Sequence, residues 1–110
     1  MTVNVRAQLR KGVVEYCILG LLATEPTYGW KLSGTLVSRG LIASIGTLYP
    51  ILGRLRAQGL ISSFDQQSDD GPSRRYYRVT DSGHLQLATF REQWGPFALT
   101  VNELVGEGTP

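Results

Sequence analysis

The side chains best suited to a chemical role lie along one expected helix, from residue 44 to residue 58. Thr47 and Tyr49 offer hydroxyl groups there, and Arg54 offers a guanidinium more than one turn further along. The face opposite the apolar stripe holds only small residues, so the pattern fits a helix that docks closely in a major groove. A solvated surface helix would show a similar amphipathic pattern. The stripe expected to face inward consists of Leu48, Ile51, Leu52 and Leu55.

Two β-prone runs follow this helix, at residues 60–64 and 75–79, and a turn-rich segment separates them. They predict a hairpin, so the whole tract is typical of a recognition helix followed by a wing. Arg74 and Arg75 lie near the turn, where they can reach phosphates or a minor groove. Three aspartates within residues 65–73 would repel phosphate and keep the tip of the wing clear of it.

Two further helices are expected upstream. A nearly all-apolar helix should run from Leu9 to Thr24, and a second from Tyr28 to about Ser38 with Thr27 as its N-cap. Gly40 fits the C-cap of the second helix, and the residues after it would form the turn of a helix-turn-helix. Ser44 is then a candidate N-cap for the helix that follows.

Near the N-terminus the pattern leaves alternatives open. Residues 1–8 show little periodicity and should fray or form an arm, which would either bring Arg6, Arg10 and Lys11 to phosphate or leave them in water. Tyr28, at the start of its helix, would either meet phosphate through neighbouring backbone amides or simply pack.

The remaining special residues favour structural roles over catalysis. Pro50 lacks an amide proton, so the first residues after Ser44 are expected to be irregular, and Trp30 is assigned to the core. Cys17, in an apolar run, fits a buried structural thiol better than a redox sensor. Cys17 and His84 lie on different expected helices, and no nucleophile has an evident base, so we expect no metal site, no cofactor and no catalytic residue.

A last helix should begin after Thr80, whose hydroxyl can cap it. Its apolar residues are spaced as a heptad seam, which favours pairing with a second subunit over ordinary core packing. Gly95 and Pro96 interrupt this pattern, so a kink is expected just after Trp94. The seam consists of Leu87, Phe90, Trp94, Phe97, Val101 and Leu104.

Charge divides the chain of 110 residues at the same place. Residues 1–80 hold ten of the eleven Lys and Arg against five of the nine Asp and Glu, whereas residues 81–110 hold one against four. This asymmetry indicates a polyanion-binding body joined to an interaction helix, although an ordinary soluble protein could carry the same charges. No signal peptide or membrane-spanning run is evident, so a cytoplasmic location is expected.

Several motifs agree in order and spacing with one known family. They run from Ile18 to Leu22, at Tyr28 and Gly29, from Thr47 to Leu52, at Arg54 and Leu55, from Gly59 to Ile61, from Arg74 to Arg78, and at Thr80 with Gly83. In these motifs the chain resembles the PadR family of transcriptional regulators, named for control of phenolic acid decarboxylase, over about residues 9 to 105. The resemblance implies a dimeric winged helix-turn-helix repressor.

Trp94 has two interpretations. As a seam residue it would pack the dimer. In some small regulators that this chain resembles, a tryptophan on the final helix lies at the dimer centre and stacks flat aromatic ligands, and Trp94 matches that place in the pattern. Paired indoles offer flat polarizable walls for such stacking. Other family members lack a pocket of this kind, so the ligand-binding and packing roles both stay open.

These observations predict a mainly α fold with a two-stranded β-wing, in which residues 1–80 form a winged helix-turn-helix DNA-binding region and residues 81–110 a C-terminal dimerisation helix and tail. We expect a homodimer that binds double-stranded DNA at a palindromic operator and represses transcription, with a small planar aromatic effector as an open addition and no membrane association. The rivals are a winged-helix module that binds protein, and a ligand-binding dimer with no DNA role. The expected DNA contacts are Tyr28, Ser44, Thr47, Tyr49, Arg54, Arg74 and Arg75.

Overall fold

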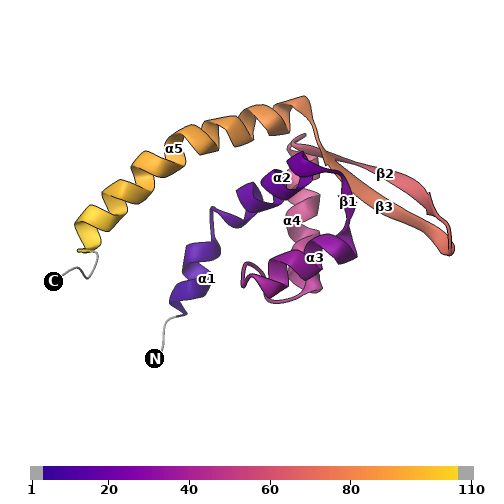
Figure 1. The fold of residues 1–110 in the computed structure, drawn as a ribbon, viewed down its shortest axis with the longest axis horizontal. Helices are drawn as coiled ribbons and strands as arrows, with labels where there is room; N and C mark the ends of the chain where they lie inside the picture. The colour runs from indigo at the N-terminus through magenta and orange to yellow at the C-terminus, as the bar shows by residue number, and fades with distance from the viewer. Residues whose placement is uncertain (1–3, 107–110) are drawn as a thin grey trace.

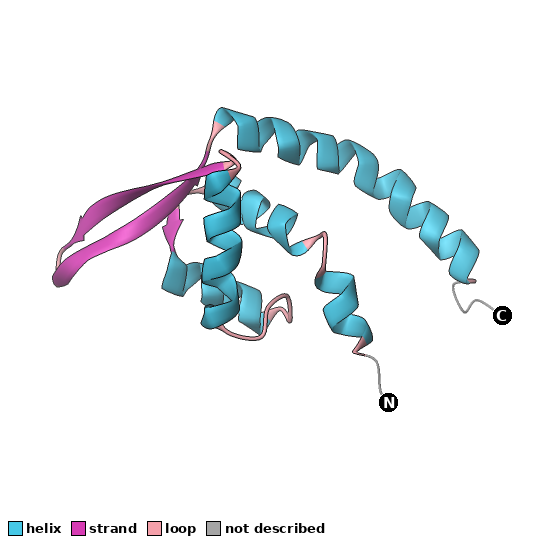
Figure 2. Cartoon of the chain, turned by 180° about the vertical axis from the view of Figure 1, so that it is seen from behind, coloured by secondary structure: helices cyan, strands magenta, loops and turns pink. Residues whose placement is uncertain are grey.

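The computed structural model of the protein describes residues 4–106. A helical body lies at the centre, a hairpin projects from it on one side, and a long C-terminal helix runs out on the other (Figures 1 and 2). No helix in the described part of the chain is long and apolar enough to cross a membrane. The elements are α1 (Val5–Arg10), α2 (Val14–Thr24), β1 (Thr27–Tyr28), α3 (Gly29–Ser38), α4 (Ile45–Ala57), β2 (Ile61–Ser68), β3 (Gly71–Val79) and α5 (Asp81–Val105).

Helices α3 and α4 form the helix-turn-helix, and both end on a glycine. Gly40 and Gly59 adopt φ values of +74° and +75°, which glycine tolerates at no steric cost. After α4, the amide of Leu60 donates to the carbonyl of Leu55 at 2.9 Å, and Leu41 makes the equivalent bond after α3. This is the Schellman arrangement, so both glycines end their helices, as the sequence predicts for Gly40.

The sheet has three antiparallel strands in the order β1-β3-β2, one more than the two-stranded wing expected from the sequence. The additional strand pairs Thr27 with Tyr77 and Tyr28 with Tyr76. The expectation that Thr27 caps α3 is therefore wrong, because Thr27 is a buried strand residue and Tyr28 holds the N-cap position. The class, a winged helix-turn-helix, is as predicted.

The hairpin of β2 and β3 is longer than predicted. Residues 65–73 were expected to be turn, yet only Asp69 and Asp70 separate the two strands. The ladder continues outward because polar and charged residues pair across it, among them Asp65 opposite Arg75. The wing therefore projects well beyond the body (Figure 1).

The core lies between α2, α3, α4 and the base of the sheet. The stripe of α4 is buried as predicted, with Leu48 and Leu55 at 0% exposure. Burial of each such side chain contributes roughly 1.5–3 kcal/mol.

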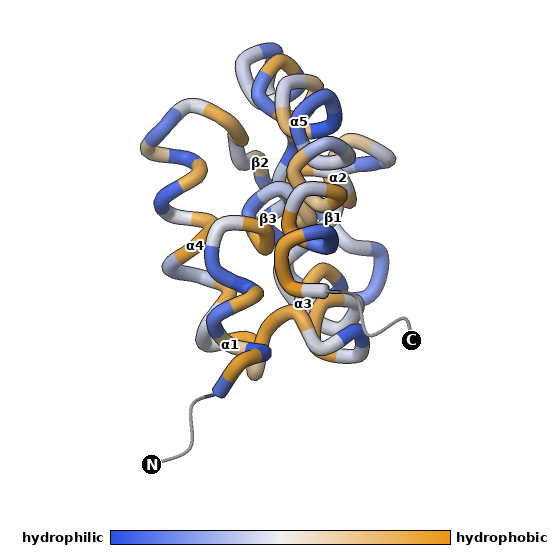
Figure 3. Tube along the Cα trace, turned by 90° about the vertical axis from the view of Figure 1, so that its left-hand side faces the viewer, coloured by the Kyte–Doolittle hydropathy of each residue, from blue (hydrophilic) through white to orange (hydrophobic). Residues whose placement is uncertain are grey.

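Cys17 packs against this core, and burial raises the pKa of its thiol, which favours the neutral form and agrees with a structural role. Figure 3 shows hydrophobic and hydrophilic residues alternating along α4 and α5.

One junction ties the end of α4 to the start of α5. The hydroxyl of Thr80 donates to the carbonyl of Gly59 at 2.6 Å and accepts from the amide of Gly83 at 3.1 Å, so Thr80 caps α5 as predicted. Gly83 is buried here, and a Cβ at this position would overlap the carbonyl oxygen of Leu60. This close approach explains why threonine and glycine occur together at this place in the sequence.

Helix α5 continues unbroken through Gly95 and Pro96 and ends where Gly106 adopts a φ of +70°. The axis bends along its length (Figure 1), and the kink expected just after Trp94 is not a break in the helix. Proline removes one amide donor and leaves the neighbouring turns bonded, so a helix can bend there without ending.

Leu87 was expected in the dimer seam, and this expectation is wrong. It is 3% exposed within its own chain and belongs to the core cluster. The reason is position, since the first turns of α5 still lie over the body while the later turns have left it (Figure 1). The same spacing therefore serves the chain's own core at Leu87 and an uncovered surface further along.

Three smaller expectations are also corrected. Asn4 caps a helix, α1, where fraying or an arm was expected, and Met1 to Val3 lie outside the described residues. Helix α4 is regular from Ile45, because Pro50 lies on the exposed side, where water can satisfy the carbonyl that loses its donor. Trp30 is 73% exposed, since the buried face of α3 starts at Gly29 and returns three residues later.

Candidate nucleic-acid interface

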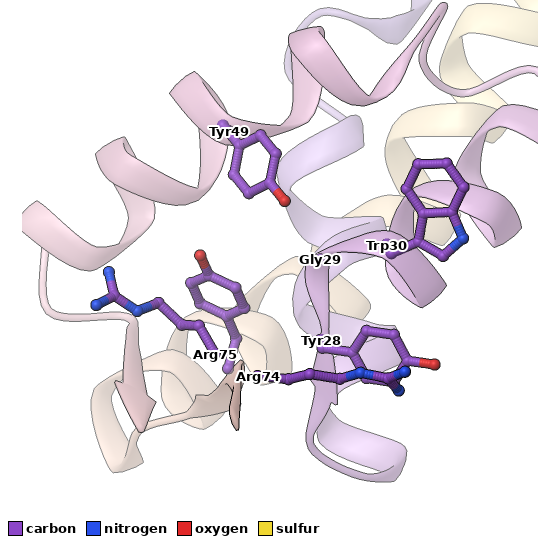
Figure 4. Close-up of a pocket in the computed structure, with 7 residues that line it drawn as sticks. Tyr28, Gly29, Trp30, Tyr49, Arg74 and Arg75 are labelled. Carbon is purple, nitrogen blue, oxygen red and sulfur yellow. The ribbon is translucent and has the colours of Figure 1, made fainter. Parts of the chain in front are cut away.

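A hollow of about 550 Å³ opens between α4, the start of α3 and strand β3 (Figure 4). It joins three stretches of chain that are distant in sequence. Two of its residues are cationic, three are phenols and none carries a carboxylate, so it fits an anion that accepts hydrogen bonds. The lining residues are Tyr28, Gly29, Trp30, Tyr49, Arg74, Arg75 and Tyr77.

Arg74 lies along the lower wall of this hollow. Its guanidinium carbon is 4.5 Å from the centroid of the Tyr28 ring (Figure 4), and that ring lies 5.4 Å from the ring of Tyr76. A guanidinium over an aromatic face is held by cation–π attraction and keeps its N–H donors available. The stack therefore fixes a positive charge at the hollow without neutralising it.

Arg75 has a partner, but a weak one. Its Nε lies 3.7 Å from Oδ1 of Asp65, and both side chains are more than half exposed. Exposed pairs of this kind contribute under about 1 kcal/mol. Exchange of Asp65 for a phosphate is therefore energetically easy.

The upper wall depends on Gly29. A Cβ at this position would lie 2.9 Å from Oη of Tyr49, so glycine lets the Tyr49 ring rest against the start of α3 and a larger residue would displace the ring. Tyr28, the N-cap, makes no side-chain capping bond, which leaves the first-turn amides of α3 without a side-chain acceptor. Those amides carry the positive end of the helix dipole.

Thr47 and Arg54 lie on the other flank of α4, away from this hollow. They line a second hollow of about 430 Å³ together with Arg10 and Lys11. Arg54 is paired there with Glu15 of α2, whose Oε1 accepts from Nη2 at 2.5 Å and from Nε at 3.2 Å. No sequence pattern indicates this ion pair, because Glu15 and Arg54 are far apart in the chain.

Of the seven sequence-predicted contacts, the structure therefore gathers four in one hollow and puts the rest elsewhere. Ser44 occupies the N-cap position of α4 but makes no side-chain capping bond. Two further arginines border the wing and were not singled out: Arg56 donates to Oγ of Ser63 at 3.2 Å, and Arg78 lies 4.2 Å over the ring of Phe64. The sequence signal for these two arginines is their position, because Arg56 shares a flank of α4 with Tyr49 and Arg78 shares a face of β3 with Arg74.

A separate aromatic groove lies where α2 meets α5. The rings of Tyr16 and Phe90 stack at 4.2 Å with an interplanar angle of 12°, and Phe90 stacks on Trp94 at 5.5 Å and 20°. Trp94 and Phe97 continue the row at 6.4 Å. A hollow of about 360 Å³ runs beside these four rings. Tyr16 was assigned only to an apolar helix, so its part in this groove was missed.

The fold and its basic, groove-sized face define a winged helix-turn-helix protein. A model of the PadR-like family of transcriptional regulators matches residues 18–89. The chain is 35% identical over 106 residues to the transcriptional regulator Rv3488 of Mycobacterium tuberculosis, covering 93% of this chain and 98% of that protein. This chain therefore belongs to the PadR-like family of transcriptional regulators, a family of regulators rather than enzymes.

Solved structures agree with this assignment. A PadR-like transcriptional regulator of Bacillus cereus is 41% identical with a TM-score of 0.81, covering 89% of this chain and 96% of that one. PadR of Bacillus subtilis, in complex with operator DNA, is 26% identical with a TM-score of 0.63 and matches 72% of this chain and 46% of its own. The second match is to a larger protein that was captured on its operator.

Proposed function

We propose that this regulator binds double-stranded DNA sequence-specifically as a homodimer and represses transcription. The observation that carries the proposal is the hollow beside α4, where Arg74, Arg75 and Tyr49 surround a space with no carboxylate in its walls. A phosphate has the charge and the acceptors for such a space. The related PadR of Bacillus subtilis, captured with operator DNA, supports the same partner.

In the proposed complex α4 enters the major groove and the wing lies along the backbone. Thr47 and Tyr49 stand on the two flanks of the exposed side of α4, so they are the proposed base or backbone contacts. Arg74 and Arg75 bind phosphate beside one flank. Arg54 binds phosphate on the other flank after it releases Glu15. Tyr28 and Ser44 belong to the same surface through their positions at the starts of α3 and α4.

The homodimer is proposed from the uncovered part of α5. Trp94, Phe97, Val101 and Leu104 recur at heptad spacing and are between 39% and 83% exposed. An exposed apolar stripe of this length marks an interaction surface. We therefore propose that residues 81–110 supply the subunit contact and residues 1–80 the DNA-binding region. We also propose that the regulator acts in the cytoplasm.

We also propose that the aromatic groove receives a planar aromatic effector that releases the protein from DNA. Tyr16, Phe90 and Trp94 already stack nearly parallel, so a flat ligand can extend the stack without rearranging it. Tyr16 follows Glu15 in α2, and Glu15 holds Arg54 of α4, which gives the groove a short covalent and polar path to the DNA-contacting helix.

DNA binding is tested by titrating a labelled mixed-sequence duplex at salt concentrations from about 50 to 200 mM. Affinity should fall steeply with salt, because phosphate contacts release counterions. A tight heteromeric protein partner without DNA affinity would instead favour a protein-interaction module. Ligand binding without salt-sensitive DNA binding would favour a ligand-binding dimer with no DNA role.

The effector is tested through Trp94 fluorescence in a Trp30→Phe background, which removes the second indole. A planar compound that stacks in the groove should quench the emission. If the compound weakens the binding of DNA by some factor, DNA should weaken the binding of the compound by the same factor. If a broad panel of planar compounds changes neither emission nor DNA affinity, and Trp94→Ala only destabilises the dimer, Trp94 is structural.

A further inference from the structure

Trp30 is the exposed aromatic side chain that the fold does not explain. It is 73% exposed on α3, whereas the residues that α3 packs inward are Gly29, Leu32, Ser33 and Leu36. An indole left in water forgoes a large burial energy and contributes little to the stability of the body. Its position is therefore better explained by a partner than by the chain itself.

The surroundings of Trp30 indicate which partner. It stands at the rim of the hollow, on the side of Gly29 away from Tyr49, and Arg74 lies below it (Figure 4). The lining is cationic and phenolic, without a carboxylate. An acidic, hydrogen-bond-accepting partner with an apolar part next to its charge fits both features. The DNA backbone alternates such parts, since each phosphate is flanked by a deoxyribose.

We infer that Trp30 is a DNA-backbone contact, whose ring packs on a deoxyribose next to a phosphate held by Arg74, which extends toward the Trp30 side of the hollow (Figure 4). The inference rests on the proposed function and adds a contact that is apolar rather than ionic. The indole N–H is a donor only, so it can also donate to a phosphate oxygen at the same place. Trp30 thereby fixes the distance between the start of α3 and the bound strand.

An apolar contact and an ionic contact differ in their response to salt. Trp30→Ala should weaken DNA binding roughly ten-fold, as buried tryptophans do at interfaces, and leave the slope of log affinity against log salt unchanged. Arg74→Ala should instead reduce that slope by about 0.9, because it removes a phosphate contact. Trp30→Phe, which keeps a ring and loses the N–H, should fall between Trp30→Ala and the unchanged protein.

Val37→Ala is the matched control. Val37 is also an exposed apolar residue of α3, at 40% exposure, but it does not line the hollow. The Val37→Ala variant should bind DNA with the same affinity and the same salt slope as the unchanged protein. Thermal unfolding of both alanine variants should match that of the unchanged protein, since neither side chain is in the core.

A direct readout comes from the two tryptophans of the chain labelled as 5-fluorotryptophan. The fluorine resonance lost in Trp30→Phe belongs to Trp30, and it should shift when duplex DNA is added, by more than the resonance of Trp94. If the unchanged protein binds no duplex, the proposed function and this inference fall together. If it binds, but Trp30→Ala binds within two-fold at every salt and the resonance stays in place, the inference alone is overturned.

Discussion

Replacing Glu15 with glutamine should tighten DNA binding while slightly destabilising the protein. In the structure, Glu15 accepts two hydrogen bonds from the guanidinium of Arg54, at 2.5 and 3.2 Å from Nη2 and Nε. While Arg54 donates to this carboxylate, part of its charge is neutralised and two of its nitrogens are occupied, so the carboxylate competes with a phosphate. Glu15→Gln keeps the shape of the side chain and removes the charge that competes with the phosphate.

The size of the effect follows from exposure. The Arg54 side chain is 56% exposed and that of Glu15 is 29% exposed, so the pair is largely screened and contributes at most about 1 kcal/mol. The variant should therefore bind DNA up to about five-fold more tightly at low salt and lose no more than about 1 kcal/mol of unfolding free energy. The slope of log affinity against log salt should stay nearly unchanged, because Arg54 makes the same phosphate contact in both proteins.

The assay is a salt series of duplex titrations with a charge-matched control. Glu92→Gln removes the same charge from α5, where Glu92 makes no ion pair within the described residues. The gain should exceed that of Glu92→Gln and should vanish when Arg54→Ala is added to Glu15→Gln. Equal affinities for Glu15→Gln and Glu92→Gln would refute the reasoning, because the carboxylate would then not compete for Arg54.

Three further changes test other parts of the surface. Arg75→Ala should weaken DNA binding and reduce the salt slope by about 0.9, and an unchanged slope in the titration would remove Arg75 from the phosphate contacts. Thr47→Ala should alter the preference among duplexes in a competition assay more than the overall affinity, whereas a uniform loss would move Thr47 to the backbone contacts. Val101→Glu should yield monomers in sedimentation, because it puts a charge in the apolar stripe of α5. Leu99→Glu changes an exposed apolar residue of α5 that lies off the stripe, so it should stay dimeric, and a dimer mass for both would reject the interface.

The helix-turn-helix and the base of the wing could be predicted because their signals are local. The α4 stripe, the glycines that end α3 and α4, and the threonine cap of α5 each depend on residues within one or two turns. The additional strand could not, since pairing Thr27 with Tyr77 is a choice between segments fifty residues apart. The hydrophobic pattern of each segment does not indicate which distant segment it pairs with.

The errors at Leu87 and Trp30 have one physical origin. Heptad spacing on α5 states which side of the helix is apolar but not what covers it, so Leu87 in the core and Val101 on the surface look alike in sequence. A tryptophan is assigned to the core by default, and only the direction of α3 reveals that Trp30 points outward. The Glu15–Arg54 pair is of the same kind, because a long-range ion pair leaves no periodic signal.

A dimer that places two copies of α4 on DNA can be detected by selecting binding sites from a pool of random duplexes and sequencing those retained. We expect a palindromic consensus, with half-sites separated by about one helical turn or a multiple of it, because two-fold symmetry in the protein imposes two-fold symmetry on the site. A single, non-repeated half-site would contradict the dimeric arrangement. A pool that shows no enrichment at all would contradict sequence-specific DNA binding itself.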